Sequence, residues 1–223
     1  MKAAFPASLT EQLWFPDPGN AVAAGDFEGL VAFGGDLNPE RLLLAYRGGI
    51  FPWTVEPITW WSPDPRGVFD LENPHWPRSL LREIRRGTFR VTFDQDFHGV
   101  IAGCAGQRRP GSWISRPFID AYTRLHELGH AHSVECWRGE RLAGGIYGVS
   151  TGGLFAGESM FHAESNASKV ALYHLVEHLR KRKFALFVVQ MVTDTTARLG
   201  ATEISRREYL RRLRKAVVMA RTF

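Results

Sequence analysis

The sequence predicts a mixed α/β fold, of the α+β kind with a mixed sheet, in which one buried strand lies inside the sheet. Residues 184–190 (FALFVVQ) are apolar almost throughout, as expected of a strand that is covered on both faces. Segments of alternating apolar residues and segments with helical spacing precede this strand. With 44% apolar residues among 223, the chain can bury a sizeable core.

The N-terminal third contains one predicted helix and the best candidate for a domain boundary. Asn38 and Pro39 are typical of an N-cap and a first helical position, so a helix is predicted over residues 39–47, ending at a Gly pair. The run WWSPDPRG, residues 60–67, has two prolines close together and no periodicity. We therefore predict a small N-terminal domain, residues 1–63, and a larger domain, residues 64–223.

The remaining elements follow from periodicity, caps and turn residues. Strands are predicted over residues 89–93, 132–138, 142–150 and 154–161, the last two joined by a tight turn at 151–153. Helices are predicted over residues 78–86 and 116–128, for four turns after Asn166, from Thr193 or Asp194, and after Ser205, which would form a capping box with Glu208.

Charge and cysteine usage narrow the class of protein. A net charge of +5 is weak support for an anionic partner. Residues 1–10 lack the apolar run of a signal peptide, and residues 184–189 fall far short of the ~20 residues that a membrane helix needs. Cys104 and Cys136 have no metal-ligand spacing and are expected to be reduced thiols. We therefore expect a cytoplasmic protein with no membrane partner.

Residues 144–172 are predicted to form a glycine-rich hairpin that runs into a helix, and they carry one carboxylate, Glu158, in an otherwise apolar strand. A carboxylate flanked by Phe155, Met160 and Phe161 is costly to bury unless something pairs with it. Glu158 is therefore a candidate for chemistry or for binding a cation.

Gln190 ends the buried strand, where ligands gather in α/β sheets. Its amide could orient an amine or hold a developing oxyanion, or it could simply cap the end of the sheet. If Glu158 lies on a neighbouring strand, the two side chains form a candidate site.

Four arginines in the helix predicted over residues 78–86 share one face, at the spacing i, i+4, i+7 and i+8: Arg78, Arg82, Arg85 and Arg86. Guanidinium groups match phosphate geometry, so the pattern favours phosphate binding. The alternative is a solvated face relieved by Glu83, although the spacing directs Glu83 elsewhere. A second basic run, residues 206–215, is interpreted as the solvated face of the last helix.

Tryptophans near Pro and Gly form a further group: Trp53, Trp60, Trp61 and Trp113. Loop tryptophans beside basic residues can stack on unpaired bases, or they can seal a junction between domains. Residues 174–178 (HLVEH) fit a zinc-peptidase pattern. We do not adopt that interpretation, because His174 lies on the apolar face of its helix and few residues follow to supply a third ligand.

Several motifs in fixed order cover nearly the whole chain: GGDLNPERLLLAYRGGIFPW from Gly34, WWSPDPRGV from Trp60, SWISRPFIDAY from Ser112, LHELGHAHSVE from Leu125, GESMF from Gly157, NASKVAL from Asn166 and LGATEISRREYL from Leu199. In these motifs the chain resembles the leucyl/phenylalanyl-tRNA–protein transferase family.

The resemblance implies a small N-terminal domain and a C-terminal domain like that of GNAT acetyltransferases. It implies transfer of Leu, Phe or more weakly Met from aminoacyl-tRNA to the N-terminal Arg or Lys of proteins, which marks them for degradation. No metal and no cofactor are expected, and we expect a monomer.

The resemblance also implies roles for individual residues. Glu158 and Gln190 would be catalytic. The terminal adenosine of the tRNA would contact Trp53 and Trp113, with Tyr46 and Tyr122 nearby, and its backbone would contact Arg78, Arg82, Arg85 and Arg86. The pocket for the aminoacyl side chain would be lined by Ile146, Phe155, Met160, Leu172, Leu175 and Phe187.

Two positions depart from the family pattern. Val188 stands where an Asp is usual, two residues before the Gln, and Ala163 stands where an Arg is usual. Two other classes stay open: an acetyltransferase that uses a CoA thioester, although a basic glycine loop for the pyrophosphate is missing, and an RNA-binding protein without catalysis.

Overall fold

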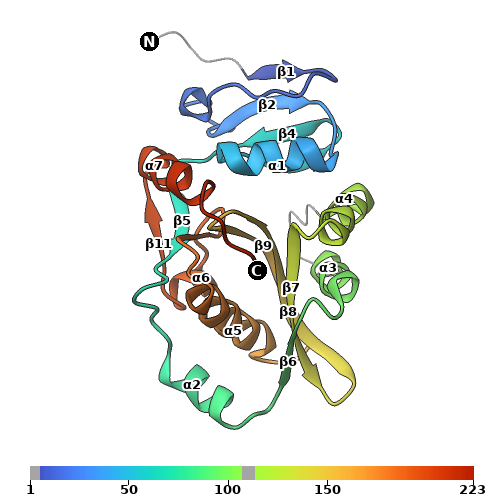
Figure 1. Ribbon diagram of the computed structural model, residues 1–223, viewed down its shortest axis with the longest axis vertical. Helices are drawn as coiled ribbons and strands as arrows, with labels where there is room; N and C mark the ends of the chain where they lie inside the picture. The colour runs from blue at the N-terminus through green and yellow to red at the C-terminus, as the bar shows by residue number, and fades with distance from the viewer. Residues whose placement is uncertain (1–5, 107–113) are drawn as a thin grey trace.

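Two β-sheets and the helices between them organise the chain in the computed structural model, which describes residues 6–106 and 114–223 (Figure 1). The smaller sheet lies above the larger one in Figure 1, with helix α1 (Pro39–Gly48) between them. The prediction of a mixed α/β fold with a small N-terminal part is confirmed. The more specific likeness to acetyltransferases stays a prediction.

The smaller sheet has the strand order β1-β2-β4-β3. Its strands are β1 (Ala7–Leu9), β2 (Leu30–Gly34), β3 (Phe51–Val55) and β4 (Ile58–Trp61), and a short 3-10 helix, η1 (Pro18–Asn20), precedes β2. The sequence did not predict these strands, because segments of three to five residues with register shifts are too short to display an alternating pattern. Helix α1 was predicted correctly, and Gly49 ends it with φ 82°, a left-handed conformation that favours Gly.

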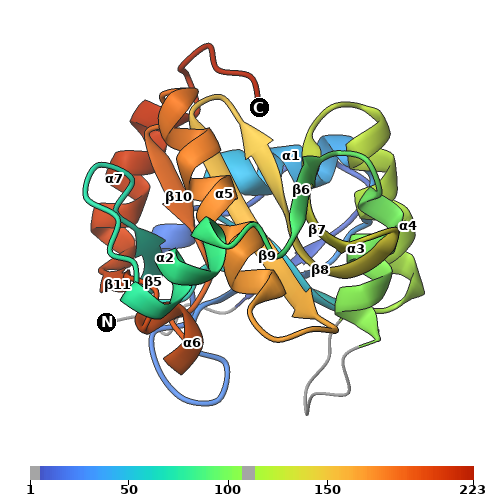
Figure 2. The same cartoon turned by 90° about the horizontal axis from the view of Figure 1, so that it is seen from below.

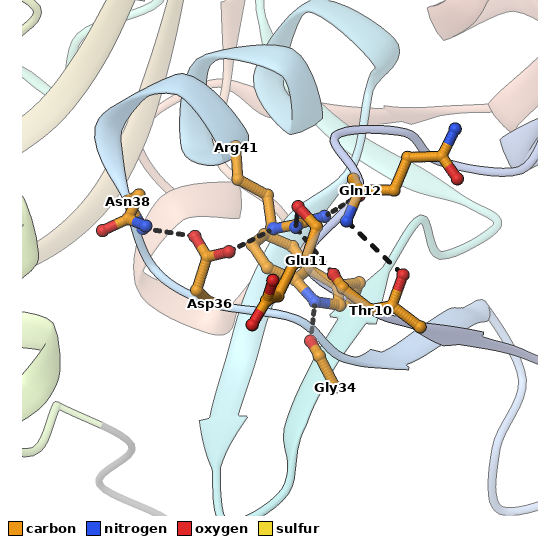
Figure 3. Close-up of polar contacts among 8 residues, drawn as sticks. Thr10, Glu11, Gln12, Gly34, Asp36, Asn38 and Arg41 are labelled. Atoms are coloured by element: carbon orange, nitrogen blue, oxygen red, sulfur yellow. Dashed lines mark hydrogen bonds and ion pairs between the residues drawn. The ribbon is translucent and has the colours of Figure 1, made fainter.

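Arg41 fastens the N-terminal segment to α1 (Figure 3). Its side chain is 1% exposed, and its Nε donates to Asp36 Oδ2 at 3.0 Å. The two Nη atoms donate to the backbone carbonyls of Thr10, Glu11 and Gln12 at 2.9–3.2 Å. These bonds satisfy the buried guanidinium and fix a stretch of chain that has little regular structure of its own.

Trp60 is a core residue, so the expectation that it lies in a loop is wrong. It is fully buried in β4, and its Nε1 donates to the backbone oxygen of Gly34 at 2.9 Å. Trp53 and Trp61 also lie in strands, β3 and β4, and are partly exposed. Successive side chains of a strand point to opposite faces, so Trp60 is buried while Trp61 lies at the surface. The four-residue β4 is too short for this alternation to be recognised in the sequence.

The larger sheet has the order β11-β5-β10-β9-β8-β7-β6. Its strands are β5 (Arg66–Phe69), β6 (Arg90–Phe93), β7 (Ala131–Arg138), β8 (Arg141–Thr151), β9 (Leu154–His162), β10 (Leu186–Val188) and β11 (Ala201–Ile204). The pair β9 and β10 is parallel and the other pairs are antiparallel. The predicted hairpin is present as β8 and β9, whereas β5 and β11 were not predicted.

The buried strand β10 lies inside the sheet, as predicted, but it is shorter than predicted. Its pairing with β9 ends where Val188 lies opposite Ala156. Gln190 then adopts φ 54°, which is unusual for a residue other than Gly and turns the chain away. The two parallel strands therefore separate at this point, and the space between their ends is available for a site.

Helices cover the two faces of the larger sheet. They are α2 (Arg78–Arg85), α3 (Phe97–Ala105), α4 (Arg116–Glu127), α5 (Ala167–Lys181), α6 (Asp194–Ala197) and α7 (Arg206–Ala216). Figure 2 shows α2 and α5 on the side of the strands that faces away from the small sheet. Helices α3, α4, α1 and α7 contribute to the core on the opposite face. No helix of the described ranges is long and apolar enough to cross a membrane.

Two details of the helices differ from expectation. Helix α3 was not predicted, because Gly99 and Gly103 interrupt its apolar pattern; a Cβ on Gly103 would lie 2.6 Å from the Phe161 ring. The capping box before α7 is only half formed. Ser205 Oγ accepts from the backbone N–H of Glu208 at 3.3 Å, but the Glu208 carboxylate binds Arg211 and Arg212 instead of returning to the cap.

One apolar cluster is continuous between the two sheets. It includes Leu42 and Trp60 from the N-terminal part, Phe118 and Tyr147 from the larger part, and Leu213 from α7. A second cluster lies on the other face, where α5 packs on β7, β8 and β9. The shared cluster packs the N-terminal part against the larger sheet.

Candidate active site

Glu158 is placed by a β-bulge in β9. Tyr147 of β8 pairs with Ser159, whereas the next residue, Gly148, pairs with Gly157, so Glu158 has no partner across the hairpin. A bulge of this kind changes the direction of the side chain that it inserts. Gly148 makes the bulge possible, because a Cβ there would lie 2.3 Å from the Ala156 carbonyl oxygen. Glu158 therefore turns its carboxylate toward the gap beside β10.

Gln190 meets Glu158 across that gap. The Gln190 Nε2 donates to Glu158 Oε1 at 2.8 Å. The two residues were singled out separately in the sequence, and the structure brings them together where the parallel strands separate. The left-handed backbone of Gln190 carries some strain, which is common at functional sites.

Two tyrosines and one arginine complete the polar cluster. Tyr46 from α1 and Tyr122 from α4 join their hydroxyls at 2.5 Å, and the Tyr122 hydroxyl lies 3.5 Å from Glu158 Oε2. The Tyr46 hydroxyl also lowers the pKa of Glu158 by favouring its ionised form. Arg66 at the start of β5 donates through Nη2 to Gln190 Oε1 at 2.6 Å.

No local signal in the sequence predicts these contacts. The role of both tyrosines near the tRNA adenosine stays a prediction, and in the structure both side chains are almost fully buried. Arg66, in the run PDPRG, was not predicted to belong to a site, because a single Arg beside prolines forms no recognisable pattern.

Burial dominates the electrostatics of the cluster. It raises the pKa of Glu158 to about 7, although hydrogen bonds from Tyr46, the charge of Arg66 and hydrogen bonds from Gln190 and Tyr122 act in the opposite direction. Burial and the neighbouring carboxylate raise the pKa of both Tyr46 and Tyr122, so these phenols stay protonated and donate. Glu158 is thus able to exchange a proton near neutral pH.

A pocket of about 260 Å³ opens beside the Glu158–Gln190 pair. Residues of β3, β5, β8, β9 and α5 form its mostly apolar walls: Phe51, Pro52, Trp53, Phe69, Ile146, Met160 and Leu172. The pocket is completed on the side where the pairing of β9 with β10 ends. The residues on that side are Gly157, Glu158, Ser159, Val189, Gln190, Met191, Thr193 and Thr196.

The predicted pocket residues divide into two groups. Ile146, Met160 and Leu172 line the pocket. Phe155, Leu175 and Phe187 do not line it and are almost fully buried. The Phe187 ring stacks on Phe69 at 5.1 Å between centroids, and Phe155 meets Phe187 edge-on at 5.8 Å. The latter group supports the wall from behind.

Trp53 is the predicted adenosine contact that reaches the pocket. Its ring lies 5.9 Å from Phe51 and 5.8 Å from Trp61, measured between centroids, in an aromatic group at the pocket wall. Trp113 lies outside the described residues.

The predicted tRNA-backbone residues lie on and just after α2. Arg78, Arg82, Arg85 and Arg86 are all exposed. The expectation that Glu83 points away from them is wrong for Arg86, whose Nη1 lies 3.8 Å from Glu83 Oε2. Arg86 follows the helix as its C-cap, and this position brings it within i+3 reach of Glu83.

Val188 and the histidine pair supply no polar group to the site. Val188 is fully buried in β10 opposite Val68, so the cluster lacks a carboxylate at that position. His178 packs against Phe93 and Phe223, and burial lowers the pKa of both His174 and His178. In the part of the chain that the structure describes, no group of three or more His, Cys, Asp or Glu could hold a metal ion.

A carboxylate with a raised pKa, an amide held against it and an apolar pocket are features expected of an enzyme that acts on a substrate with an apolar group. Comparison with known proteins makes this class specific. The family described as leucyl/phenylalanyl-tRNA protein transferase matches residues 68–214, and its N-terminal domain matches residues 35–64.

Individual relatives agree with the family match. A leucyl/phenylalanyl-tRNA–protein transferase of Anaeromyxobacter sp. (strain Fw109-5) is 53% identical over 214 residues, which cover 94% of this chain and 89% of the relative. One from Shigella dysenteriae serotype 1 (strain Sd197) is 52% identical and covers 88% and 84%. The chain belongs to the leucyl/phenylalanyl-tRNA–protein transferase family, an enzyme family of the acyltransferase type.

A solved structure is only remotely similar. The C-terminal domain of a putative lysylphosphatidylglycerol synthetase from Agrobacterium fabrum aligns with 74% of this chain and 56% of its own, with a TM-score of 0.39 and 14% identity. A similarity this low contributes nothing to the assignment.

Proposed function

We propose that this protein transfers Leu, Phe and, more weakly, Met from aminoacyl-tRNA to the N-terminal Arg or Lys of acceptor proteins and so marks them for degradation. Membership in the family supports the proposal. The observation that carries it in this chain is the contact between Glu158 and Gln190, 2.8 Å long, at the wall of an apolar pocket. The pocket would receive the amino acid, and the polar pair would receive the acceptor amine.

The pocket suits unbranched Cβ atoms and adaptable apolar side chains. Ile146, Met160 and Leu172 would contact the aminoacyl side chain, while Phe155, Leu175 and Phe187 would support the wall. Met160 can adapt to both Leu and Phe because its side chain is flexible and polarisable. Shape at Cβ would disfavour Ile and Val, but one methylene is worth only about 1–3 kcal/mol, so discrimination is incomplete.

The tRNA would bind on both sides of this pocket. Trp53, which lies at the pocket wall, would stack on the terminal adenosine, and we propose the same role for Trp113. Tyr46 and Tyr122 would approach that end of the tRNA through their hydroxyls. The exposed arginines 78, 82, 85 and 86 would contact the tRNA backbone, where guanidinium groups pair with phosphate.

The reaction is aminolysis of an ester. Glu158 would take one proton from the α-ammonium of the acceptor and later release it to solvent, and Gln190 would orient the resulting amine. The nitrogen–carbon bond then forms and the bond between the carbonyl carbon and the ribose oxygen breaks. The nitrogen gives up a second proton in this step, and that proton ends on the ribose oxygen. Because the ester is already activated, positioning the two groups supplies much of the effect, up to ~7–11 kcal/mol in favourable cases.

The same proposal includes the architecture and surroundings of the enzyme. We propose a domain boundary after residue 63, in the segment that leaves the small sheet and precedes β5. We also propose a cytoplasmic monomer that uses no metal and no cofactor.

Single-turnover transfer of labelled Phe from Phe-tRNA to a peptide with an N-terminal Arg tests the proposal. We expect Glu158→Gln to lower the rate about a hundredfold, the usual size of a lost acid–base catalyst. We expect Gln190→Ala to lower it about tenfold through the loss of one hydrogen bond to a charged group.

The other outcomes point to different functions. Unchanged rates in both variants would overturn the roles of Glu158 and Gln190. Binding of tRNA without transfer would indicate an RNA-binding protein, an alternative that the buried Val188 keeps open. Acylation of a peptide from a CoA thioester, without use of Phe-tRNA, would indicate an acetyltransferase.

A further inference from the structure

Arg66 is a buried cation next to the Glu158–Gln190 pair. It begins β5, and Val68 two residues later pairs with Val188 of β10. The backbone N–H of Gly67 donates to the Gln190 oxygen at 3.1 Å, so the antiparallel contact continues past the end of β10. Gly67 thus bonds to both Val189 and Gln190, and this backbone contact brings the side chains of Arg66 and Gln190 close enough to meet.

The contact between them fixes the orientation of the Gln190 amide. Arg66 Nη2 donates to Gln190 Oε1 at 2.6 Å, and Gln190 Nε2 donates to Glu158 Oε1 at 2.8 Å. A guanidinium can only donate and an ionised carboxylate can only accept. A flipped amide would oppose donor to donor at Arg66 and acceptor to acceptor at Glu158. The two neighbours thus permit a single orientation, with the NH2 group toward the carboxylate.

The charge of Arg66 has no ion-pair partner. Its side chain is 1% exposed, and among the described residues no carboxylate lies within 4.0 Å of it. Instead the guanidinium carbon lies 4.6 Å from the ring centroids of both Phe51 and Tyr209. Aromatic faces stabilise a cation without neutralising it. Burying an unneutralised charge is costly, which favours a functional reason for keeping it.

We propose that Arg66 is a positioning residue of the transfer reaction, which holds the Gln190 amide in its productive orientation and keeps the Glu158 carboxylate ionised until the acceptor amine arrives. This inference rests on the proposed function. Phe51 belongs to the N-terminal sheet and Tyr209 to the C-terminal helix α7. Because both rings contact Arg66, the position of its guanidinium depends on how these two parts pack.

Several groups besides Arg66 act on the Glu158 carboxylate. Gln190 reaches it from the end of β10, Tyr46 from α1 and Tyr122 from α4. The hydroxyls of Tyr147 in β8 and Tyr209 in α7 also interact with it electrostatically. Arg66 is the one cation that acts on Glu158 within the described cluster. Its removal should therefore make the carboxylate harder to ionise and raise the pKa of Glu158.

The pH dependence of single-turnover Phe transfer tests the proposal with Arg66→Met, a neutral side chain of similar length. We expect the rate of the wild-type protein to rise with pH and level off above a midpoint near 7, as Glu158 ionises. In R66M we expect the midpoint to move up by about one pH unit, the effect of removing a nearby opposite charge. The plateau rate should fall at least about tenfold through the loss of the orienting hydrogen bond.

Arg41→Met is the matched control. Arg41 is equally buried, at 1% exposure, but it binds Asp36 and the N-terminal segment and does not contact the site. R41M should lower the melting temperature while leaving the midpoint unchanged. Tight binding of Phe-tRNA should persist in R66M, since the proposal assigns Arg66 no contact with tRNA.

The inference is overturned if R66M is folded and keeps both the wild-type midpoint and the wild-type plateau rate. If R66M does not fold, Arg66→Lys replaces it. The charge retained in R66K should preserve the midpoint while the plateau rate falls, so a wild-type plateau rate in R66K would refute the orienting role. Failure of the wild-type protein itself to transfer Phe would instead refute the proposed function.

Discussion

At the scale of single residues, the central feature is the balance of forces on Glu158. Burial opposes its negative charge, while two tyrosine hydroxyls, one amide and one guanidinium favour it. The balance leaves the pKa of Glu158 at about 7, above the ordinary value of 4.5. A carboxylate in this range can both accept and return a proton at neutral pH, as the proposed conversion of the acceptor's ammonium group into an amine requires.

This balance predicts a pH-dependent stability. Because the pKa of Glu158 is higher in the folded state than the ordinary 4.5, the folded protein loses stability as pH rises from 4.5 through about 7. The loss approaches about 3 kcal/mol at most. In Glu158→Gln this loss should disappear, so the difference in unfolding free energy between variant and wild type should grow with pH. Urea unfolding at pH 5 and pH 8 measures it.

Glu140→Gln serves as the control for that experiment. Glu140 is exposed in the turn between β7 and β8, so this variant shows the effect of removing a carboxylate that is not part of the Glu158 cluster. A stability difference between Glu158→Gln and wild type that stays constant between pH 5 and pH 8 would contradict the raised pKa.

At the scale of elements, the bulge in β9 separates the polar group from the pocket wall. Glu158 lies on the same face as Ala156, toward the core beneath the small sheet that also contains Tyr46 and Tyr122. The inserted residue breaks the regular alternation of the strand, and Met160 joins Phe155 on the α5 face although their numbers differ by five. The bulge thus combines an apolar pocket wall and a polar group within one strand.

Gly148→Ala should close the bulge or disrupt the hairpin. Its Cβ would lie 2.3 Å from the Ala156 oxygen and 2.5 Å from the Phe155 ring, so we expect a stability loss of about 3 kcal/mol and loss of Phe transfer. Gly139→Ala, at φ 59° with open space around it in the neighbouring turn, should cost only about 1 kcal/mol and leave transfer intact. Thermal unfolding and single-turnover transfer distinguish the two. Equal effects of both substitutions would show that the bulge has no special role.

Helix α2 and helix α7 both carry arginines, but their surroundings differ. Arg211 and Arg212 of α7 are engaged by Glu208, whereas Arg82 of α2 has no ion-pair partner among the described residues. Free guanidinium groups on one exposed face are better placed to meet phosphates than groups that are already paired.

Arg82→Glu should therefore weaken tRNA binding about tenfold at low salt. It should also reduce the slope of log affinity against log salt by about 0.9 for a lost contact to duplex phosphate. Titrations of tRNA at several salt concentrations measure both quantities. Arg214→Glu, an exposed position on α7, is the control and should leave the slope unchanged. An equal change of slope in both variants would mean that the protein's general field, not α2, binds the tRNA.

At the scale of the whole molecule, the two sheets share a core and the site lies where they meet. Phe51 of the small sheet lines the pocket and packs on Arg66, and α1 contributes Tyr46 to the Glu158 cluster. The N-terminal part is thus both a cover over the larger sheet and a supplier of site residues. Separation of the two parts would dismantle the polar cluster.

A shared core predicts one cooperative unfolding transition. Leu213 of α7 is 2% exposed in the cluster that connects both parts, and Leu213→Ala should destabilise the protein by about 2–5 kcal/mol. Calorimetry should show a single transition in the wild-type protein and a single, lower one in L213A. A first transition that unfolds residues 6–61 alone would contradict this coupling.

Local signals in the sequence determined the elements whose ends carry caps and turns. The helix between Pro39 and Gly49, the tight turn at Gly152 and the helix after Asn166 are present as predicted. Glu158 and Gln190 could be singled out because a carboxylate in an apolar strand and an amide at the end of a buried strand are each unusual where they stand. The family resemblance added residue roles that local signals alone do not give.

Only the tertiary structure decided how these residues meet. The short strands of the N-terminal sheet, the bulge at Glu158 and the two buried tyrosines have no local signature, because each is stabilised by contacts with distant segments. Arg66 and Gln190 are separated by 124 positions, yet their side chains lie 2.6 Å apart. Caps and periodicity act over a few residues and can be read in sequence, whereas burial and the contacts that satisfy a buried charge exist only once the chain has packed.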